Sequence, residues 1–206
     1  MNATAAPLPR FGDGRAVRVG LLGGSFNPAH GGHLHVARLA LARLGLDQVW
    51  LLVSPGNPLK PRRGMAPLAQ RLAGARALVD GRRILATAIE CDLGTRYAVD
   101  TARALRRRFP RVRFVWLLGA DNLVQLPRWH RWTEFAAAMP LAVVARPGCV
   151  RVALSGRAAR RLHSARRPVH DANGLADRAP PAWVFLPVRL HQGSATAIRA
   201  ARGERP

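Results

Sequence analysis

The sequence has little lysine, cysteine and acidic charge and no long apolar run, and these shortages exclude several classes of protein. Lys60 is the only lysine, so arginine accounts for the other 32 of the 33 basic residues. Cys91 and Cys149 are the only cysteines, and their separation matches no metal or redox spacing, so we expect a reduced, cytoplasmic protein. No apolar run approaches the length of a membrane span, so we expect no membrane partner.

The N-terminal stretch, residues 1–15, lacks the basic and then apolar pattern of a signal peptide. We expect it to be a loose leader that precedes a single domain over residues 16–206. The composition, with 49% hydrophobic and 21% charged residues, is that of a globular domain large enough to bury its own core.

Only 11 acidic residues oppose the 33 basic ones, which gives a formal net charge of +22. A surface of this charge attracts phosphates, so a basic nucleic-acid-binding protein is one hypothesis. The arginines are scattered over many segments, however, and neither a zinc-finger spacing nor a basic region followed by heptads is present. Abundant Ala, Gly, Pro and Arg with almost no Lys also matches a GC-biased coding sequence. We therefore expect no specific nucleic-acid partner.

Short apolar runs typical of strands alternate with longer helical patterns along the chain. The predicted strands are Val17 to Leu22, Gln48 to Val53, Ile84 to Ala86, Arg113 to Leu118, Leu141 to Ala145 and Trp183 to Leu186. The predicted helices are Gly32 to Leu44, Pro67 to Val79, Val99 to Phe109, and a short one near Trp129 to Ala138. This alternation predicts an α/β fold, with a Rossmann-like, doubly wound parallel sheet in a single domain.

The stretch from Val150 to Pro181 is rich in Arg, Ala and Pro and carries no predicted strand or helix. We expect part of it to be mobile.

The segment GGSFNPAHGGH, residues 23–33, follows the first predicted strand. Gly23 and Gly24 lack a Cβ, so the backbone can turn sharply there and a ligand can approach closely. His30 and His33 are three residues apart and project together where the next helix begins. The free N–H groups of a first helical turn favour a bound phosphate, and imidazoles can donate hydrogen bonds to a transferring phosphoryl group. The segment therefore predicts phosphate chemistry.

Two other unusual segments, SPGNPLK and GADNLVQLPRWHRW, follow the second and fourth predicted strands. Ligands of open parallel sheets bind outside the carboxyl ends of the strands, so we expect these segments to share one site with residues 23–33.

Two other interpretations of the histidines are open. His30, His33 and His35 could bind zinc, although no cysteine lies near them and the HExxH spacing is absent. The histidines could instead cap the helix or pack in the core.

The first segment resembles the GxFxPxHxGH signature of the nucleotidyltransferase superfamily, whose members transfer a nucleotidyl group between phosphates. The second signature of that superfamily, Ser-x-Thr-x-x-Arg, is matched by SATAIR, residues 194–199. Read from the residues alone, Ser194 or Thr196 can cap a helix start, and the planar fork of Arg199 suits a phosphate; an ordinary capped helix with a surface arginine is the alternative.

Within that superfamily, the sequence most resembles the bacterial nicotinate-nucleotide adenylyltransferases. GTRYAVDT, residues 94–101, is similar to their x-Ser-Tyr-Thr-x-x-Thr segment, GADNLVQLPRWHRW to their Gly-x-Asp…Trp segment, and ARPG, residues 145–148, to the Arg-Pro-Gly after the fifth strand. The sequence departs from the family pattern where Asn27 replaces an Asp, Leu59 a His and Ala98 a Thr.

The resemblance implies adenylyl transfer from ATP to nicotinate mononucleotide, with His30, His33 and Arg199 as the catalytic residues. The residues that it implies for ATP binding are Gly23, Gly24, Ser25, Phe26, His30, His33, Gly119, Asp121, Ser194, Thr196 and Arg199. Those that it implies for nicotinate mononucleotide are Lys60, Ala98, Trp129, His130 and Arg146, with Trp129 beside the pyridine ring and the main-chain N–H groups of Ala98 and His130 on its carboxylate.

The expected cofactor is Mg²⁺, which arrives with ATP and needs no dedicated protein ligands. Homo-oligomer formation is left open. Another adenylyltransferase of the superfamily, such as phosphopantetheine adenylyltransferase, would share both signatures and is the alternative within this class.

Overall fold

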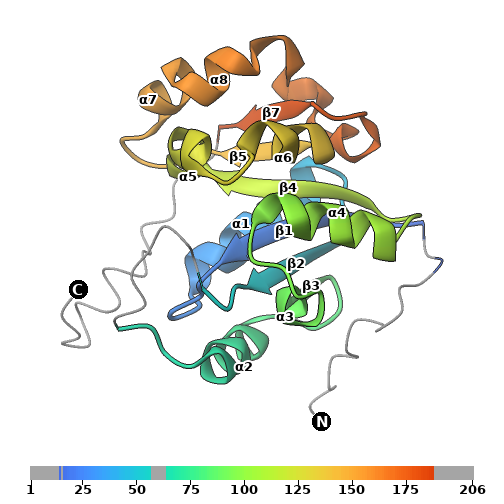
Figure 1. Cartoon of the computed structure of the whole chain (residues 1–206), viewed down its shortest axis with the longest axis vertical. Helices are drawn as coiled ribbons and strands as arrows, with labels where there is room; N and C mark the ends of the chain where they lie inside the picture. The colour runs from blue at the N-terminus through green and yellow to red at the C-terminus, as the bar shows by residue number, and fades with distance from the viewer. Residues whose placement is uncertain (1–13, 15, 57–63, 188–206) are drawn as a thin grey trace.

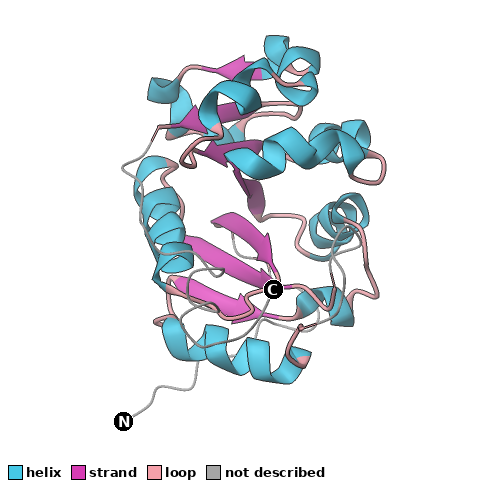
Figure 2. Cartoon of the chain, turned by 90° about the vertical axis from the view of Figure 1, so that its left-hand side faces the viewer, coloured by secondary structure: helices cyan, strands magenta, loops and turns pink. Residues whose placement is uncertain are grey.

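The protein folds around a parallel sheet of seven strands, with helices on both faces (Figures 1 and 2). The computed structural model describes residue 14, residues 16–56 and residues 64–187. The strands are β1 (Arg18–Gly24), β2 (Gln48–Val53), β3 (Ile84–Thr87), β4 (Arg113–Gly119), β5 (Leu141–Val144), β6 (Arg166–Arg167) and β7 (Trp183–Leu186). Their order in the sheet is β3-β2-β1-β4-β5-β7-β6, and every neighbouring pair is parallel. The predicted doubly wound fold is confirmed.

All six predicted strands are present, because each is an almost unbroken apolar run of the kind that a sheet covered on both faces requires. The seventh strand, β6, was not predicted. It consists of Arg166 and Arg167, whose backbone pairs with Trp183 and Val184 of β7 while their side chains are exposed. An edge strand of two arginines carries no hydrophobic signal.

The helices are α1 (Gly31–Arg43), α2 (Leu68–Leu78), α3 (Ile89–Asp92), α4 (Ala98–Arg108), α5 (Ala120–Gln125), α6 (Trp132–Ala138), α7 (Val150–Ser155) and α8 (Arg157–Arg161). One core lies between the sheet and α4 to α8, and a second lies between the opposite face and α1 and α2. Alternate residues of one strand serve the two cores, as Leu21 and Leu22 of β1 do. Among the described residues, no helix is long and apolar enough to cross a membrane.

The predicted helix from Trp129 to Ala138 is wrong at its start. A short 3₁₀ turn ends at Arg128, Arg131 adopts the left-handed conformation with φ +50°, and α6 begins only at Trp132. Trp129 and Trp132 therefore do not share a helix, and a bend in the chain separates them.

The stretch from Val150 to Pro181, for which no strand or helix was predicted, contains regular secondary structure. It forms α7, α8, β6 and several 3₁₀ turns, and its small apolar residues, such as Ala153 and Ala158, are buried in the core. The indole N–H of Trp183 donates to the carbonyl oxygen of Leu162 over 2.8 Å and ties the stretch to β7. Alanine gives too weak a hydrophobic signal for this packing to be read from the sequence.

Candidate active site

The candidate site lies where the order of the strands reverses, outside the carboxyl ends of β1 and β4. β1 lies between β2 and β4, and successive connections leave in opposite directions from it, which opens a crevice at this point. Gly23 and Gly24 end β1, Ser54 follows β2, and Gly119 ends β4. The expected convergence of the three unusual segments is confirmed for their described residues.

His30 and His33 cap the start of α1 with their own rings. The Nδ1 atom of His30 accepts the N–H of Gly32 over 3.1 Å, and Nδ1 of His33 accepts the N–H of His30 over 3.2 Å. The two ring centroids are 3.9 Å apart. The helix-capping interpretation is therefore correct for the Nδ1 atoms. It does not exclude phosphate chemistry, because each ring has a second nitrogen.

The capping bonds also fix how the rings carry their protons. A neutral imidazole whose Nδ1 accepts a hydrogen bond holds its proton on Nε2, so each neutral ring is a donor at Nε2. Burial, with help from the charges of His30 and Arg146, lowers the pKa of His33 from 6.5 to about 3. His33 is therefore a neutral Nε2–H donor at physiological pH.

Phe26 packs against the ring of His33. Its side chain is 1% exposed, and its ring centroid lies 4.7 Å from that of His33. Its backbone has φ +49°, a left-handed conformation that is rare for a bulky residue and that marks the sharp turn after β1. The buried ring supports the imidazole, so any contact of Phe26 with a ligand would be through its backbone.

Asp121 and Arg146 form an ion pair at the carboxyl ends of β4 and β5, with 3.0 Å between Oδ1 and Nε. A Cβ on Gly119 would collide with both side chains, so this position requires glycine if the pair is to form. The charge of Arg146 acts on the His33 ring. Arg146, assigned from the sequence to the mononucleotide, thus lies with Asp121 on the side of the histidines.

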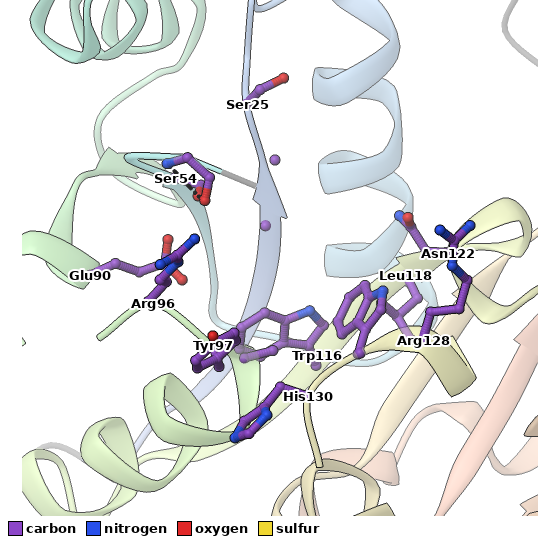
Figure 3. Close-up of a pocket in the computed structure, with 15 residues that line it drawn as sticks. Ser25, Ser54, Glu90, Arg96, Tyr97, Trp116, Leu118, Asn122, Arg128 and His130 are labelled. Atoms are coloured by element: carbon purple, nitrogen blue, oxygen red, sulfur yellow. Dashed lines mark hydrogen bonds between the residues drawn. The ribbon is translucent and has the colours of Figure 1, made fainter. Parts of the chain in front are cut away.

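A pocket of about 280 Å³ opens beside the two glycines (Figure 3). The predicted site residues that line it are Gly23, Gly24, Ser25, Ala98, Trp129 and His130. These residues from three separate segments of the chain thus meet at one cavity, which the glycine turn after β1 borders.

The backbone N–H groups of Ala98 and His130, both in the pocket wall, have no acceptor among the described residues, and the same holds for those of Ser25, Arg96 and Tyr97. Ala98 is the first residue of α4, whose preceding residue, Tyr97, gives no side-chain cap. The free N–H of Ala98 therefore carries the partial positive charge of a helix start. The rings of Tyr97 and His130 lie against each other, with centroids 4.3 Å apart, which holds the two donor segments together.

Several residues of the pocket were not predicted, among them Trp116, Asn122, Glu90, Arg96 and Arg128. Trp116 was taken for an ordinary strand residue, because a pocket wall and a core give the same apolar signal. Arg96 and Arg128 were not predicted because the sequence contains many arginines and nothing local distinguishes these two. One signal could have found Arg96, Asn122 and Arg128: they lie within two segments that the sequence analysis had already selected, GTRYAVDT and GADNLVQLPRWHRW.

Glu90 is the buried carboxyl group of the pocket. Its side chain is 9% exposed, and its Oε1 atom accepts a hydrogen bond from the Thr101 hydroxyl over 3.2 Å. Burial raises the pKa of Glu90, while the Thr101 hydrogen bond acts in the opposite direction. The Thr101 hydroxyl also lies 2.9 Å from that of Thr95. This network fixes the loop before α4.

Arg71 of α2 holds the loops after β1 and β2 together. The residue is 4% exposed, and its guanidinium donates to the carbonyl oxygens of Ser25 over 2.6 Å, Ser54 over 2.8 Å and Ala66 over 2.8 Å. Both loops contribute to the pocket, so Arg71 positions the pocket without lining it.

The remaining predicted site residues, Lys60, Ser194, Thr196 and Arg199, lie outside the described residues, as does most of the predicted leader. Within the described ranges, no group of three or more His, Cys, Asp or Glu side chains is placed to hold a metal ion.

Comparison with known proteins gives concordant results. The model of the cytidylyltransferase-like family matches residues 21–201. A probable nicotinate-nucleotide adenylyltransferase of Gluconobacter oxydans is 57% identical over 92% of this chain and 97% of its own length. One of Gluconacetobacter diazotrophicus is 56% identical over 94% of this chain and 90% of its own.

Solved structures show the same fold. Plasmodium falciparum nicotinic acid mononucleotide adenylyltransferase, complexed with NaAD, superposes with a TM-score of 0.67 at 12% identity over 89% of this chain and 83% of its own. A putative nicotinate-nucleotide adenylyltransferase of Vibrio parahaemolyticus gives a TM-score of 0.53 at 16% identity, over 66% of this chain and 78% of its own. The family model covers most of the chain, and the bacterial relatives are more than half identical to it. The chain therefore belongs to the cytidylyltransferase-like family and, within it, to the bacterial nicotinate-nucleotide adenylyltransferases.

Proposed function

We propose that this protein transfers the adenylyl group of ATP to nicotinate mononucleotide, giving nicotinate adenine dinucleotide and pyrophosphate in NAD biosynthesis. The observation that carries the proposal is one cavity with an aromatic lining and the free N–H groups of Ala98 and His130, beside a pair of histidines of which His33 is neutral. The relatives at 56–57% identity bear the matching name. A cytoplasmic location stays a prediction.

The pocket suits the pyridine end of the acceptor. A carboxylate between Ala98 and His130 would receive both free N–H groups, and the partial charge at the start of α4 would stabilise it. Trp129 lines the same pocket and is held by Phe135, with ring centroids 5.6 Å apart. Its indole would lie beside an electron-poor ring.

The histidine side suits the transferring phosphate. The phosphate oxygen of the mononucleotide would attack the α-phosphorus of ATP in line, as the bond from that phosphorus to pyrophosphate breaks. No covalent enzyme intermediate is needed, so catalysis consists of positioning and charge stabilisation. His30 and His33 would donate from Nε2 to oxygens that gain charge during the transfer.

The rest of the phosphate machinery is carried over from the sequence motifs and stays a prediction. Ser194, Thr196 and Arg199 would bind the ATP phosphates, and Lys60 would contact the phosphate of the mononucleotide. We propose that Mg²⁺ is held mainly by ATP oxygens, since Asp121, the carboxylate that follows β4, is already paired with Arg146. When bound, the ion would neutralise part of the phosphate charge.

A pyrophosphate-release assay with ATP and a panel of acceptors tests the proposal. The panel holds nicotinate mononucleotide, nicotinamide mononucleotide and phosphopantetheine. We expect the nicotinate form to be preferred over the amide by about tenfold to a few hundredfold, because the amide NH₂ would face an N–H donor and leave it unpaired. Equal specificity constants for the two nucleotides, or a preference for phosphopantetheine, would contradict the proposal.

A further inference from the structure

Arg96 lines the acceptor pocket, although it stands where the family segment has Ser. It lies in the loop between α3 and α4, two residues before Ala98. In Figure 3 its guanidinium lies on the same side of the pocket as Glu90 and Ser54. Its Cζ atom is 5.8 Å from the centroid of the Tyr97 ring.

Within the described part of the chain, the charge of Arg96 faces the Tyr97 ring but is not neutralised by an acid. No described carboxylate forms an ion pair with Arg96, and its guanidinium donates no hydrogen bond to a described residue, whereas Arg103, Arg131 and Arg146 all pair with acids. Among the described residues that line the pocket, the acid is Glu90. Burial raises the pKa of Glu90, and Glu90 forms no ion pair with Arg96 among the described residues.

A second arginine, Arg128, lies on the other side of the pocket beside Asn122 (Figure 3). Asn122 belongs to α5, which begins at the Asp121–Arg146 ion pair, and the charge of Arg146 acts on His33. The Arg128 side is therefore continuous with the histidines, where the phosphate must lie for transfer. Arg96 lies across the pocket from Arg128.

We propose that Arg96 is a specificity-determining residue that pairs with the carboxylate of the acceptor ring and so strengthens the preference for the acid over the amide. This inference rests on the proposed function. The N–H groups of Ala98 and His130 satisfy the carboxylate oxygens, and the guanidinium of Arg96 adds a full positive charge two residues from Ala98. A neutral carboxamide gains little from that charge, whereas a carboxylate gains a charge-assisted hydrogen bond.

Specificity constants for the two mononucleotides, measured with Arg96→Gln and Arg96→Lys, test the proposal. We expect Arg96→Gln to lower kcat/KM for the nicotinate form by about five- to tenfold, mainly through KM, because one charged hydrogen bond at an exposed side chain is lost. The value for the nicotinamide form should change less than about twofold, so the ratio falls. Arg96→Lys should keep most of the ratio.

Two further variants serve as controls. Arg157→Gln removes an exposed arginine of α8, outside the pocket, and should leave both constants unchanged. Arg128→Gln should lower both constants together. A second readout is salt: the acid-to-amide ratio of the parent protein should fall as salt rises, and that of Arg96→Gln should stay flat.

Thermal melting checks that Arg96→Gln is folded. In the folded variant, equal losses for both nucleotides, or no loss for either, would overturn the inference. The outcome is distinct from failure of the proposed function, which would appear as no turnover of nicotinate mononucleotide by the parent protein.

Discussion

Single side chains in this site do two tasks at once. His30 and His33 use Nδ1 to satisfy N–H groups at the start of α1, and the same bonds direct the ring proton to Nε2. Structural and chemical roles are thus divided between the two nitrogens of one ring. An alanine variant would remove both and could not separate them.

Two amide substitutions of His33 separate these roles. In His33→Asn, the side-chain oxygen can replace Nδ1 as the acceptor for His30, but the Nε2–H donor is lost. We expect turnover to fall about 10²–10³-fold with little change in the KM for ATP, because the donor acts on charge that develops in the transition state. His33→Gln, which keeps a donor near the Nε2 position, should retain more activity. Near-normal turnover in folded His33→Asn would reduce His33 to a helix cap.

The lowered pKa of His33 predicts how stability depends on pH. The unfolded chain takes up this proton near pH 6.5, whereas the folded protein does so near pH 3. The unfolded state therefore binds more protons between these values, and stability is full above pH 6.5 and falls as the pH drops.

Between pH 7 and pH 5, we expect the parent protein to lose about 2 kcal/mol more unfolding free energy than His33→Asn, which has no such group. Urea unfolding at the two pH values measures the difference. If the profiles of the two proteins run parallel, the ring titrates normally in the folded state.

At the scale of elements, the site depends on how separate connections are held against each other. The loops after β1 and β2 both border the pocket, and α2 joins them through Arg71. The loop before α4 is fixed by Glu90, Thr95 and Thr101. The pocket is therefore a property of helices and strands packed together, and residues that never line it can decide its shape.

Arg71→Met tests this dependence. Because the guanidinium donates to three carbonyl oxygens in a buried place, its loss should lower the free energy of unfolding by roughly 3–5 kcal/mol. Arg71→Lys should have an intermediate effect. Arg76→Met, an exposed position on the same helix, is the matched control and should stay within about 0.5 kcal/mol of the parent. Chemical denaturation gives all three values; an unchanged value for Arg71→Met would show that the loops hold without the clamp.

On the scale of the whole molecule, the net charge of +22 is the dominant electrostatic feature. Some of the positive charge is neutralised by local ion pairs; for example, Arg18 and Arg113 both pair with Asp177. The rest is spread over helices and loops on several sides of the sheet. Such a surface attracts any polyanion without selecting one.

We therefore expect weak, sequence-independent binding of duplex DNA that disappears at moderate salt. Fluorescence anisotropy with labelled duplexes of unrelated sequence, over a salt titration, measures it. Binding that prefers one sequence and survives moderate salt would restore the nucleic-acid hypothesis that the composition raised.

The sequence by itself determined the strands, the main helices and the glycine–histidine turn. These features are local: apolar runs such as that of β2 and a motif of eleven residues can be recognised without knowing what lies across the fold. Position at strand ends then followed from a general rule of parallel sheets, which is why Gly23 and Trp129 could be assigned to one site in advance, whereas Ala98 was assigned from the family resemblance.

Only the tertiary structure decided what surrounds those residues. The clamp of Arg71, the buried Glu90, the pairing of Arg146 with Asp121 and the exposed strand β6 all depend on contacts between residues distant in the chain. One arginine among 32 gives no local sign of whether it is buried, paired or directed into a pocket. That difference arises from packing and desolvation, which exist only once the chain has folded.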